Sequence, residues 1–183
     1  MLPEQYVLFI WSEYGRKNLK NAIAAFAIVK QKFPNLVFVK APAQLGILRE
    51  KTVSYVVESG LEAWKDVMFI DEYLSHEQCA ELYSGARLFL FPSLSEWFGF
   101  PIIEAQSCGC PVITTNYWPM NELVPYTELT VDPNNPEDIA EKMLKVLEDD
   151  NLRTQIIEDW RMFSQKFSWE NTAKGFDTLI KSF

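Results

Sequence analysis

Two carboxylates, Glu96 and Glu104, mark the segment of this chain that is best suited to chemistry. Seven residues separate them, and Gly99 and Pro101 lie between. Pro101 stands where a helix would begin, because its missing N–H costs nothing in a first helical turn. The start of such a helix presents unpaired N–H groups and the positive end of the helix dipole, which suit a phosphate or another electronegative oxygen. Gly99 would let a ligand approach the backbone closely.

The two glutamates would flank an anion bound at this helix start. An ionised carboxylate can only accept hydrogen bonds, so both side chains suit sugar hydroxyls better than phosphates. A crevice with N–H groups in the middle and carboxylates at both ends therefore fits a sugar nucleotide. The residues alone leave an alternative open, in which Glu104 is an ordinary first-turn glutamate and Glu96 is a solvated loop residue.

The elements that carry these residues are predicted from apolar patterning. A short apolar run before the loop is typical of a strand that is buried on both faces, and Gly109 is a typical helix end. The sequence predicts a strand over 87–91, a loop over 95–100, a helix over 101–108 and a strand over 111–114.

Strands and helices are predicted to alternate along the whole chain. Further strands are expected at 6–11, 36–39, 67–70 and 128–131, and further helices at 17–32, 42–60, 75–84, 136–149, 152–166 and 171–183. This alternation predicts an α/β fold with a doubly wound parallel sheet, Rossmann-like, in a single domain over 1–183 that ends in a helical segment over 168–183. Ligands of such sheets bind at the carboxyl ends of the strands, so the loops after residues 11 and 91 could face one crevice.

Composition and charge exclude several classes of protein. The chain has 183 residues with a net charge of −8, and a nucleic-acid binder would need a basic face that nothing here indicates. No apolar run approaches the ~18 residues of a membrane span, and the first residues lack a secretory signal. The three cysteines lack metal-ligand spacing, and there is no His cluster or Asp-x-Asp pair, so we expect no metal and a reduced, cytoplasmic protein.

The run from Glu96 to Glu104, EWFGFPIIE, followed by AQSCGCPVI, closely resembles the E-x7-E signature of retaining glycosyltransferases of the GT-B fold, family 4. The usual form of this motif has Gly after the first Glu and Leu before the Pro, where this chain has Trp97 and Phe100. The resemblance covers nearly the full chain and implies the C-terminal, donor-binding half of such an enzyme. It also implies that an N-terminal, acceptor-binding domain is missing from this chain and that any membrane contact belongs to that domain.

The resemblance assigns roles to particular residues. Arg16 and Lys17, in the run YGRKNL, match the cations that hold the donor diphosphate in the family, although by themselves they could be solvated surface charges. Glu96 is expected to contact the transferred sugar and Glu104 the ribose. Backbone N–H groups around Gly99, Phe100 and Pro101 are expected to hold phosphate and sugar oxygens.

The predicted function is donor binding in a retaining hexosyltransferase that uses a nucleoside-diphosphate sugar, such as a UDP- or GDP-hexose, as substrate and needs no cofactor. A non-catalytic sugar-nucleotide-binding or regulatory module on a degenerate GT-B half is the main alternative, because Trp97 could fill the sugar pocket. A sugar-nucleotide epimerase is a further alternative. A pyridoxal phosphate-dependent phosphorylase is disfavoured because no lysine lies between Lys65 and Lys142.

Overall fold

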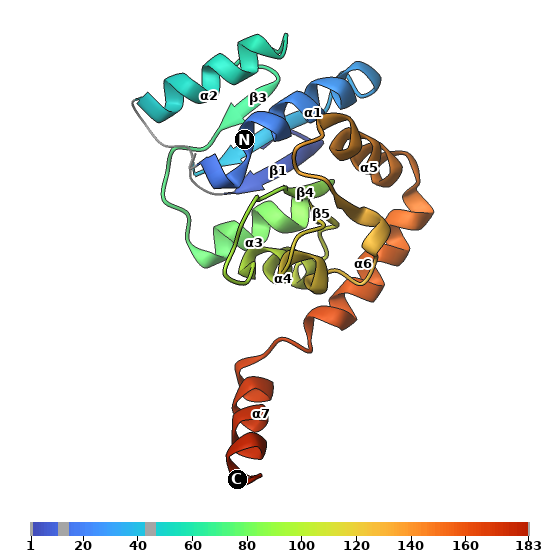
Figure 1. Cartoon of the computed structure of the whole chain (residues 1–183). Helices are drawn as coiled ribbons and strands as arrows, with labels where there is room; N and C mark the ends of the chain where they lie inside the picture. The colour runs from blue at the N-terminus through green and yellow to red at the C-terminus, as the bar shows by residue number, and fades with distance from the viewer. Residues whose placement is uncertain (1, 11–14, 43–46, 183) are drawn as a thin grey trace.

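The computed structural model describes residues 2–10, 15–42 and 47–182, and within them it forms one six-stranded sheet flanked by helices (Figure 1). The strand order is β3-β2-β1-β4-β5-β6, and every neighbouring pair is parallel. The strands are β1 (Tyr6–Ile10), β2 (Val37–Ala41), β3 (Val67–Phe69), β4 (Leu88–Phe91), β5 (Val112–Thr115) and β6 (Thr130–Val131). The predicted doubly wound α/β sheet is therefore confirmed. Trp11, predicted as the last residue of the first strand, lies outside the described residues.

Helices cover both faces of the sheet. Contacts group α1 with α2 and α5 on one face, and α4 with α3 and α6 on the other (Figure 1). The helices are α1 (Leu19–Lys32), α2 (Ile47–Glu58), α3 (His76–Gly85), α4 (Phe100–Ser107), α5 (Pro136–Glu148), α6 (Asp150–Ser164) and α7 (Trp169–Lys181). This two-sided cover explains why β1 and β4 are apolar at every position, since each residue of both strands is buried.

The strand order reverses between β1 and β4, which are direct neighbours although β2 and β3 lie between them in sequence. In open α/β sheets the loops that leave such a pair diverge to opposite faces and open a crevice at the carboxyl ends. The loop after β1 carries Arg16 and Lys17, and the loop after β4 carries Glu96. The fold thus brings together residues that are far apart in the sequence.

Several predicted elements have different bounds in the structure. The helix predicted over 42–60 corresponds to α2, and residues 43–46 lie outside the described residues. The helix predicted from residue 17 begins at Leu19, because Gly15–Lys17 form a short 3-10 helix and Asn18 adopts a left-handed backbone with φ 60°. Arg16 and Lys17 therefore precede α1 and do not belong to its first turn. The strand predicted over 128–131 is shortened to β6, since a 3-10 turn at Thr127–Leu129 occupies its first part.

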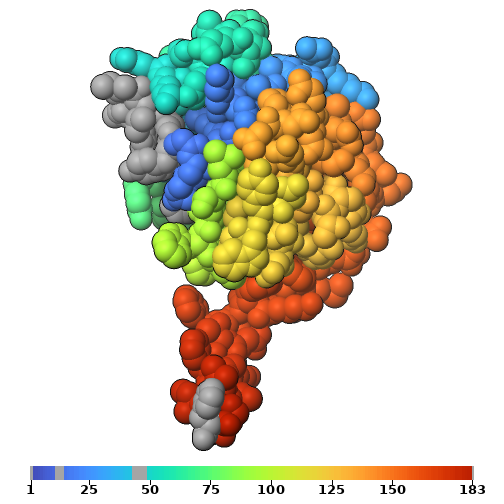
Figure 2. All heavy atoms as spheres, viewed as in Figure 1, coloured from blue at the N-terminus to red at the C-terminus, as the bar shows by residue number. Residues whose placement is uncertain are grey.

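Helix α7 stands apart from the layered body (Figures 1 and 2). None of its residues is buried. Its polar side carries two ion pairs, Glu170 with Lys174 and Asp177 with Lys181, each spaced one helical turn apart. The other side presents exposed apolar side chains, namely Trp169, Phe176, Leu179 and Ile180.

Candidate functional site

The loops after β1 and β4 are joined by backbone and side-chain hydrogen bonds. The Leu94 N–H donates to the Arg16 carbonyl oxygen at 2.8 Å, and the Arg16 guanidinium donates to the Ser95 carbonyl oxygen at 3.2 Å. These bonds place the two sequence-predicted cations directly beside the loop that carries Glu96.

Glu96 lies between the two cations. Its Oε1 accepts a hydrogen bond from Lys17 Nζ at 2.6 Å, and its Oε2 accepts one from Arg16 Nη1 at 2.7 Å. The Glu96 side chain is only 10% exposed, so it is not the solvated loop residue that the sequence left open. Lys17 is also buried, with its ammonium 5.1 Å from the centre of the Phe91 ring, whereas Arg16 is half exposed.

Burial and pairing act in opposite directions on these charges. Burial raises the pKa of Glu96, but hydrogen bonds from Lys17, Arg16 and Ser93 outweigh it and hold that pKa below its ordinary value. Burial lowers the pKa of Lys17, and the hydrogen bond to Glu96 offsets only part of this effect. The arrangement favours an ionised Glu96, and it leaves Lys17 as a desolvated cation that a further anion would stabilise.

The start of α4 forms the next wall of the site. Gly99 is the residue before the helix and has φ 112°, a left-handed conformation that side chains rarely adopt. A Cβ added at Gly99 would lie 3.0 Å from Leu123 Cδ1, so packing as well as backbone geometry selects glycine. Phe100 and Pro101 follow as the first two residues of α4, as the position of the proline predicted.

Glu104 is the fifth residue of α4, and the first turn of this helix carries no acidic residue. Glu104 therefore lies just past the first turn of the helix, and its role in the site stays a prediction. Glu104 is exposed, and its Oε2 accepts a hydrogen bond from the Tyr83 hydroxyl at 3.2 Å. Tyr83 is buried and packs edge-on against Phe89 at 5.2 Å between ring centres. A core tyrosine thus orients a carboxylate at the surface.

All seven sequence-predicted site residues line one hollow of about 370 Å³, which Trp97 and Phe98 also border. The predicted residues are Arg16, Lys17, Glu96, Gly99, Phe100, Pro101 and Glu104. Trp97 is 97% exposed, so its indole leaves the hollow open. The structure brings these residues together, while their individual roles in binding and catalysis stay predictions.

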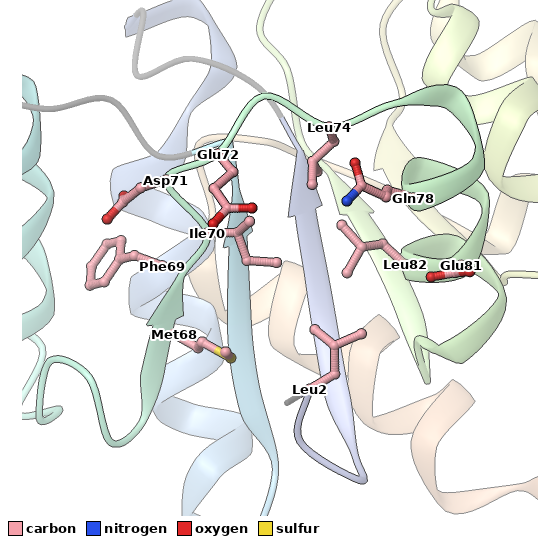
Figure 3. A pocket seen from close by; sticks show the side chains of 10 residues that line it. All are labelled: Leu2, Met68, Phe69, Ile70, Asp71, Glu72, Leu74, Gln78, Glu81 and Leu82. Carbon is pink, nitrogen blue, oxygen red and sulfur yellow. The ribbon is translucent and has the colours of Figure 1, made fainter.

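A second hollow of about 530 Å³ runs between β3 and α3, and Leu2 borders the end that lies beside the start of β1 (Figure 3). At the carboxyl ends of the strands its border includes Asp71, Glu72 and Leu74. Asp71 forms an ion pair with Arg49 of α2. Tyr73, which follows Glu72, is 95% exposed and does not border this hollow.

Sequence reasoning gave no role to three residues that the structure places at the site. Ser93 bonds Glu96, Tyr83 bonds Glu104, and Asn18 bonds the loops after β4 and β6. The sequence signal for Asn18 was an asparagine directly after Lys17, because asparagine tolerates a left-handed backbone. The structure shows this conformation at Asn18. The contacts of Ser93 and Tyr83 depend on tertiary packing and leave no signal in the local sequence.

Within the described residues no group of three or more His, Cys, Asp or Glu side chains could hold a metal ion. In the same part of the chain no helix is both long and apolar enough to cross a membrane.

The fold and the site define a Rossmann-like α/β domain in which two cations meet a carboxylate at a switch point of the sheet. Residues 2–162 match the sequence profile described as "Glycosyl transferases group 1", and the chain belongs to this family. It is 33% identical to O-antigen chain mannosyltransferase B of Escherichia coli over 91% of this chain and 43% of that protein. It is 30% identical to the serotype-specific mannosyltransferase WbdA of Escherichia coli over 99% of this chain and 23% of that protein.

Solved structures have the same fold. Sucrose-phosphate synthase from Thermosynechococcus elongatus superposes with a TM-score of 0.83 at 27% identity, over 98% of this chain and 45% of that one. The C-terminal domain of the group 1 glycosyltransferase LpcC from Francisella tularensis superposes with a TM-score of 0.74 at 22% identity, over 88% of this chain and 84% of that one. The chain thus spans less than half of the full-length relatives described here.

Proposed function

We propose that this chain is the donor-binding part of a retaining glycosyltransferase of family 4, which transfers a hexose from a nucleoside-diphosphate sugar. The observation that carries the proposal is the placement of Glu96 between Lys17 and Arg16 on the wall of a hollow that Glu104 and the start of α4 also border. Cations, N–H groups and carboxylates are the groups that a diphosphate and the hydroxyls of two sugars require.

In this proposal the cations act on the leaving group. Lys17 and Arg16 would hold the donor diphosphate and stabilise the negative charge that develops on it as the glycosidic bond breaks. The desolvated position of Lys17 strengthens this effect, because charges interact more strongly where water is excluded. A bound diphosphate would share the two cations with Glu96, which would turn one of its oxygens toward the hydroxyls of the transferred sugar.

Glu104 would accept hydrogen bonds from the ribose hydroxyls, with Tyr83 holding its carboxylate in place. Backbone N–H groups of Gly99 and Phe100 would approach phosphate and sugar oxygens at the start of α4. We assign no protein nucleophile, no metal and no cofactor. The acceptor would bind to a further, N-terminal domain of the whole protein, and cytoplasmic nucleotide sugars would supply the donor.

A sugar pocket filled by Trp97 would have supported the alternative of a non-catalytic module. The indole is almost fully exposed and the hollow is open, so this feature gives the alternative no support. The names of the E. coli relatives favour a mannose donor for those proteins, and we extend this to the present chain as a proposal.

Calorimetric titration of this chain with GDP-mannose, UDP-glucose and ADP-glucose tests the proposal. We expect one of them to bind weakly, because this chain spans less than half of its full-length relatives. Lys17→Ala or Glu104→Gln should weaken that binding about tenfold or more. Lys32→Ala is the matched control, since this lysine lies at the far end of α1 and pairs with Glu148 at the surface. Equal affinity of the wild type, the two site variants and the control would contradict the proposal, as would a wild type that binds none of the three at millimolar concentration.

A further inference from the structure

Asn18 connects three loops at the carboxyl edge of the sheet. It is 8% exposed and separates the 3-10 helix that carries Arg16 and Lys17 from α1. Its side-chain amide donates to the Pro92 carbonyl oxygen at 3.1 Å and to the Pro133 carbonyl oxygen at 2.5 Å. Pro92 directly follows β4 and Pro133 follows β6, so one NH₂ group ties the ends of two strands to the start of α1.

These bonds act at the point where the spacing of the site is set. Pro92 lies four residues before Glu96, and Asn18 is the residue next to Lys17, so the bond to Pro92 fixes both members of the 2.6 Å ion pair from nearby backbone. The hydrogen bond from the Leu94 N–H to the Arg16 carbonyl oxygen joins the same two loops, because Leu94 lies between Pro92 and Glu96 in the sequence. The loop after β6 is held by Asn18 and also by Asn21, whose amide donates to the same Pro133 oxygen at 2.9 Å.

We propose that Asn18 is a positioning residue of this site, whose amide holds the Glu96 loop and the loop after β6 at a fixed distance from Lys17 and Arg16. The inference rests on the proposed function for its consequence in donor binding. Its structural part, the spacing of the loops, stands on the hydrogen bonds alone. Asparagine suits both tasks, because it tolerates a left-handed backbone and carries two N–H donors for two carbonyl oxygens.

Substitutions at Asn18 can separate the contribution of its left-handed backbone from the contribution of its two side-chain hydrogen bonds. Asn18→Gly keeps the backbone conformation and removes both hydrogen bonds, so any effect reports on the amide. Asn18→Ala removes the same bonds and adds the strain of a Cβ at φ 60°. Asn21→Ala is the matched control, because it removes a neighbouring bond to Pro133 without touching the Glu96 loop.

The experiment measures amide hydrogen exchange, the temperature of thermal unfolding and the affinity for GDP-mannose, UDP-glucose and ADP-glucose. The 183-residue chain and its three variants are compared. In Asn18→Gly we expect the Leu94 amide to exchange about tenfold faster or more while the amides of β1 keep their protection, and donor affinity to fall about tenfold. Asn18→Ala should reproduce these changes with an additional loss of thermal stability, and Asn21→Ala should leave the Leu94 amide unchanged.

Unchanged Leu94 exchange in Asn18→Gly would overturn the inference, and so would faster exchange with undiminished donor affinity. A wild type that binds no donor would overturn the proposed function instead. In that case the exchange rates would still decide whether Asn18 sets the loop spacing, so the two failures are distinguishable.

Discussion

At the scale of single residues, the site depends on charges whose partners come from distant parts of the chain. Glu96 shares its two carboxylate oxygens between Lys17 and Arg16, and Glu104 receives the hydroxyl of Tyr83. A buried or half-buried ion is stable only when its partners are in place. Each of these pairs can therefore be tested by removing one partner while the shape of the side chain is kept.

Tyr83→Phe removes the hydroxyl that orients Glu104 and retains the ring that packs on Phe89. We expect donor affinity to fall by about 1 kcal/mol, roughly fivefold, with little change in the unfolding temperature. Tyr6→Phe is the matched control, since its buried hydroxyl donates to the Leu82 carbonyl oxygen and does not contact a site residue. Titration of donor into both variants measures the difference, and an unaltered affinity in Tyr83→Phe would show that Glu104 needs no such support.

The lowered pKa of Glu96 predicts a dependence of stability on pH. Its pKa in the folded chain lies below its ordinary value of 4.5, so the unfolded chain binds the proton more tightly. The stabilisation from Glu96 is therefore complete above its unfolded-state pKa and is lost as the pH falls through the folded-state pKa. Urea unfolding of wild type and Glu96→Gln between about pH 3 and pH 6 measures this. The difference in the free energy of unfolding between wild type and Glu96→Gln should become smaller as the pH falls. A difference that stays constant over this range would contradict the pairing of Glu96 with Lys17 and Arg16.

At the scale of elements, the backbone at the start of α4 is as important as the side chains around it. Gly99 combines a left-handed φ with close packing against Leu123 and Ile102, so the turn into the helix admits no larger residue without strain. The 3-10 helix before α1 is the corresponding element on the other side of the crevice. These two helix starts, on opposite sides of the switch point, set the width of the hollow.

Gly99→Ala is expected to destabilise the chain by about 1–3 kcal/mol, because alanine must adopt a left-handed conformation and its Cβ must displace Leu123. Donor affinity should fall as well, since the strained turn would shift the backbone N–H groups that we propose hold the phosphate. Gly15→Ala is the control, as a Cβ at Gly15 meets nothing within 4 Å. Chemical denaturation compares the two, and equal stability of both variants would show that the turn relaxes freely.

At the scale of the whole molecule, the layered body and α7 differ in how they are held. The body encloses its apolar side chains between two layers of helices. Helix α7 buries none of its residues and projects from the body (Figure 2). Stability should therefore reside in the body. The chain spans less than half the length of its full-length relatives.

A chain ending at Ser168 should keep the unfolding temperature of the full chain within a few degrees, because the deleted helix contributes no buried residue. Trp160→Ala is the contrasting variant. Trp160 is almost fully buried in α6 and packs near Tyr126, so its truncation should cost about 3–5 kcal/mol. Thermal unfolding followed by circular dichroism compares the shortened chain with Trp160→Ala. A large fall in the unfolding temperature on deletion of α7 would show that this helix contributes to the stability of the body.

The sequence by itself determined the sheet, most of the helices and the segment that carries the two glutamates. Apolar runs such as Tyr6–Ile10 and Leu88–Phe91 are local signals of buried strands, and Pro101 marks the start of α4. Only the tertiary structure decided which charges meet. Glu96 is 79 residues from Lys17, and Asn18 is 115 residues from Pro133. Such contacts follow from strand order and loop geometry. The strands β1 and β4 become neighbours only when the sheet forms, and no pattern within either segment indicates that they pair.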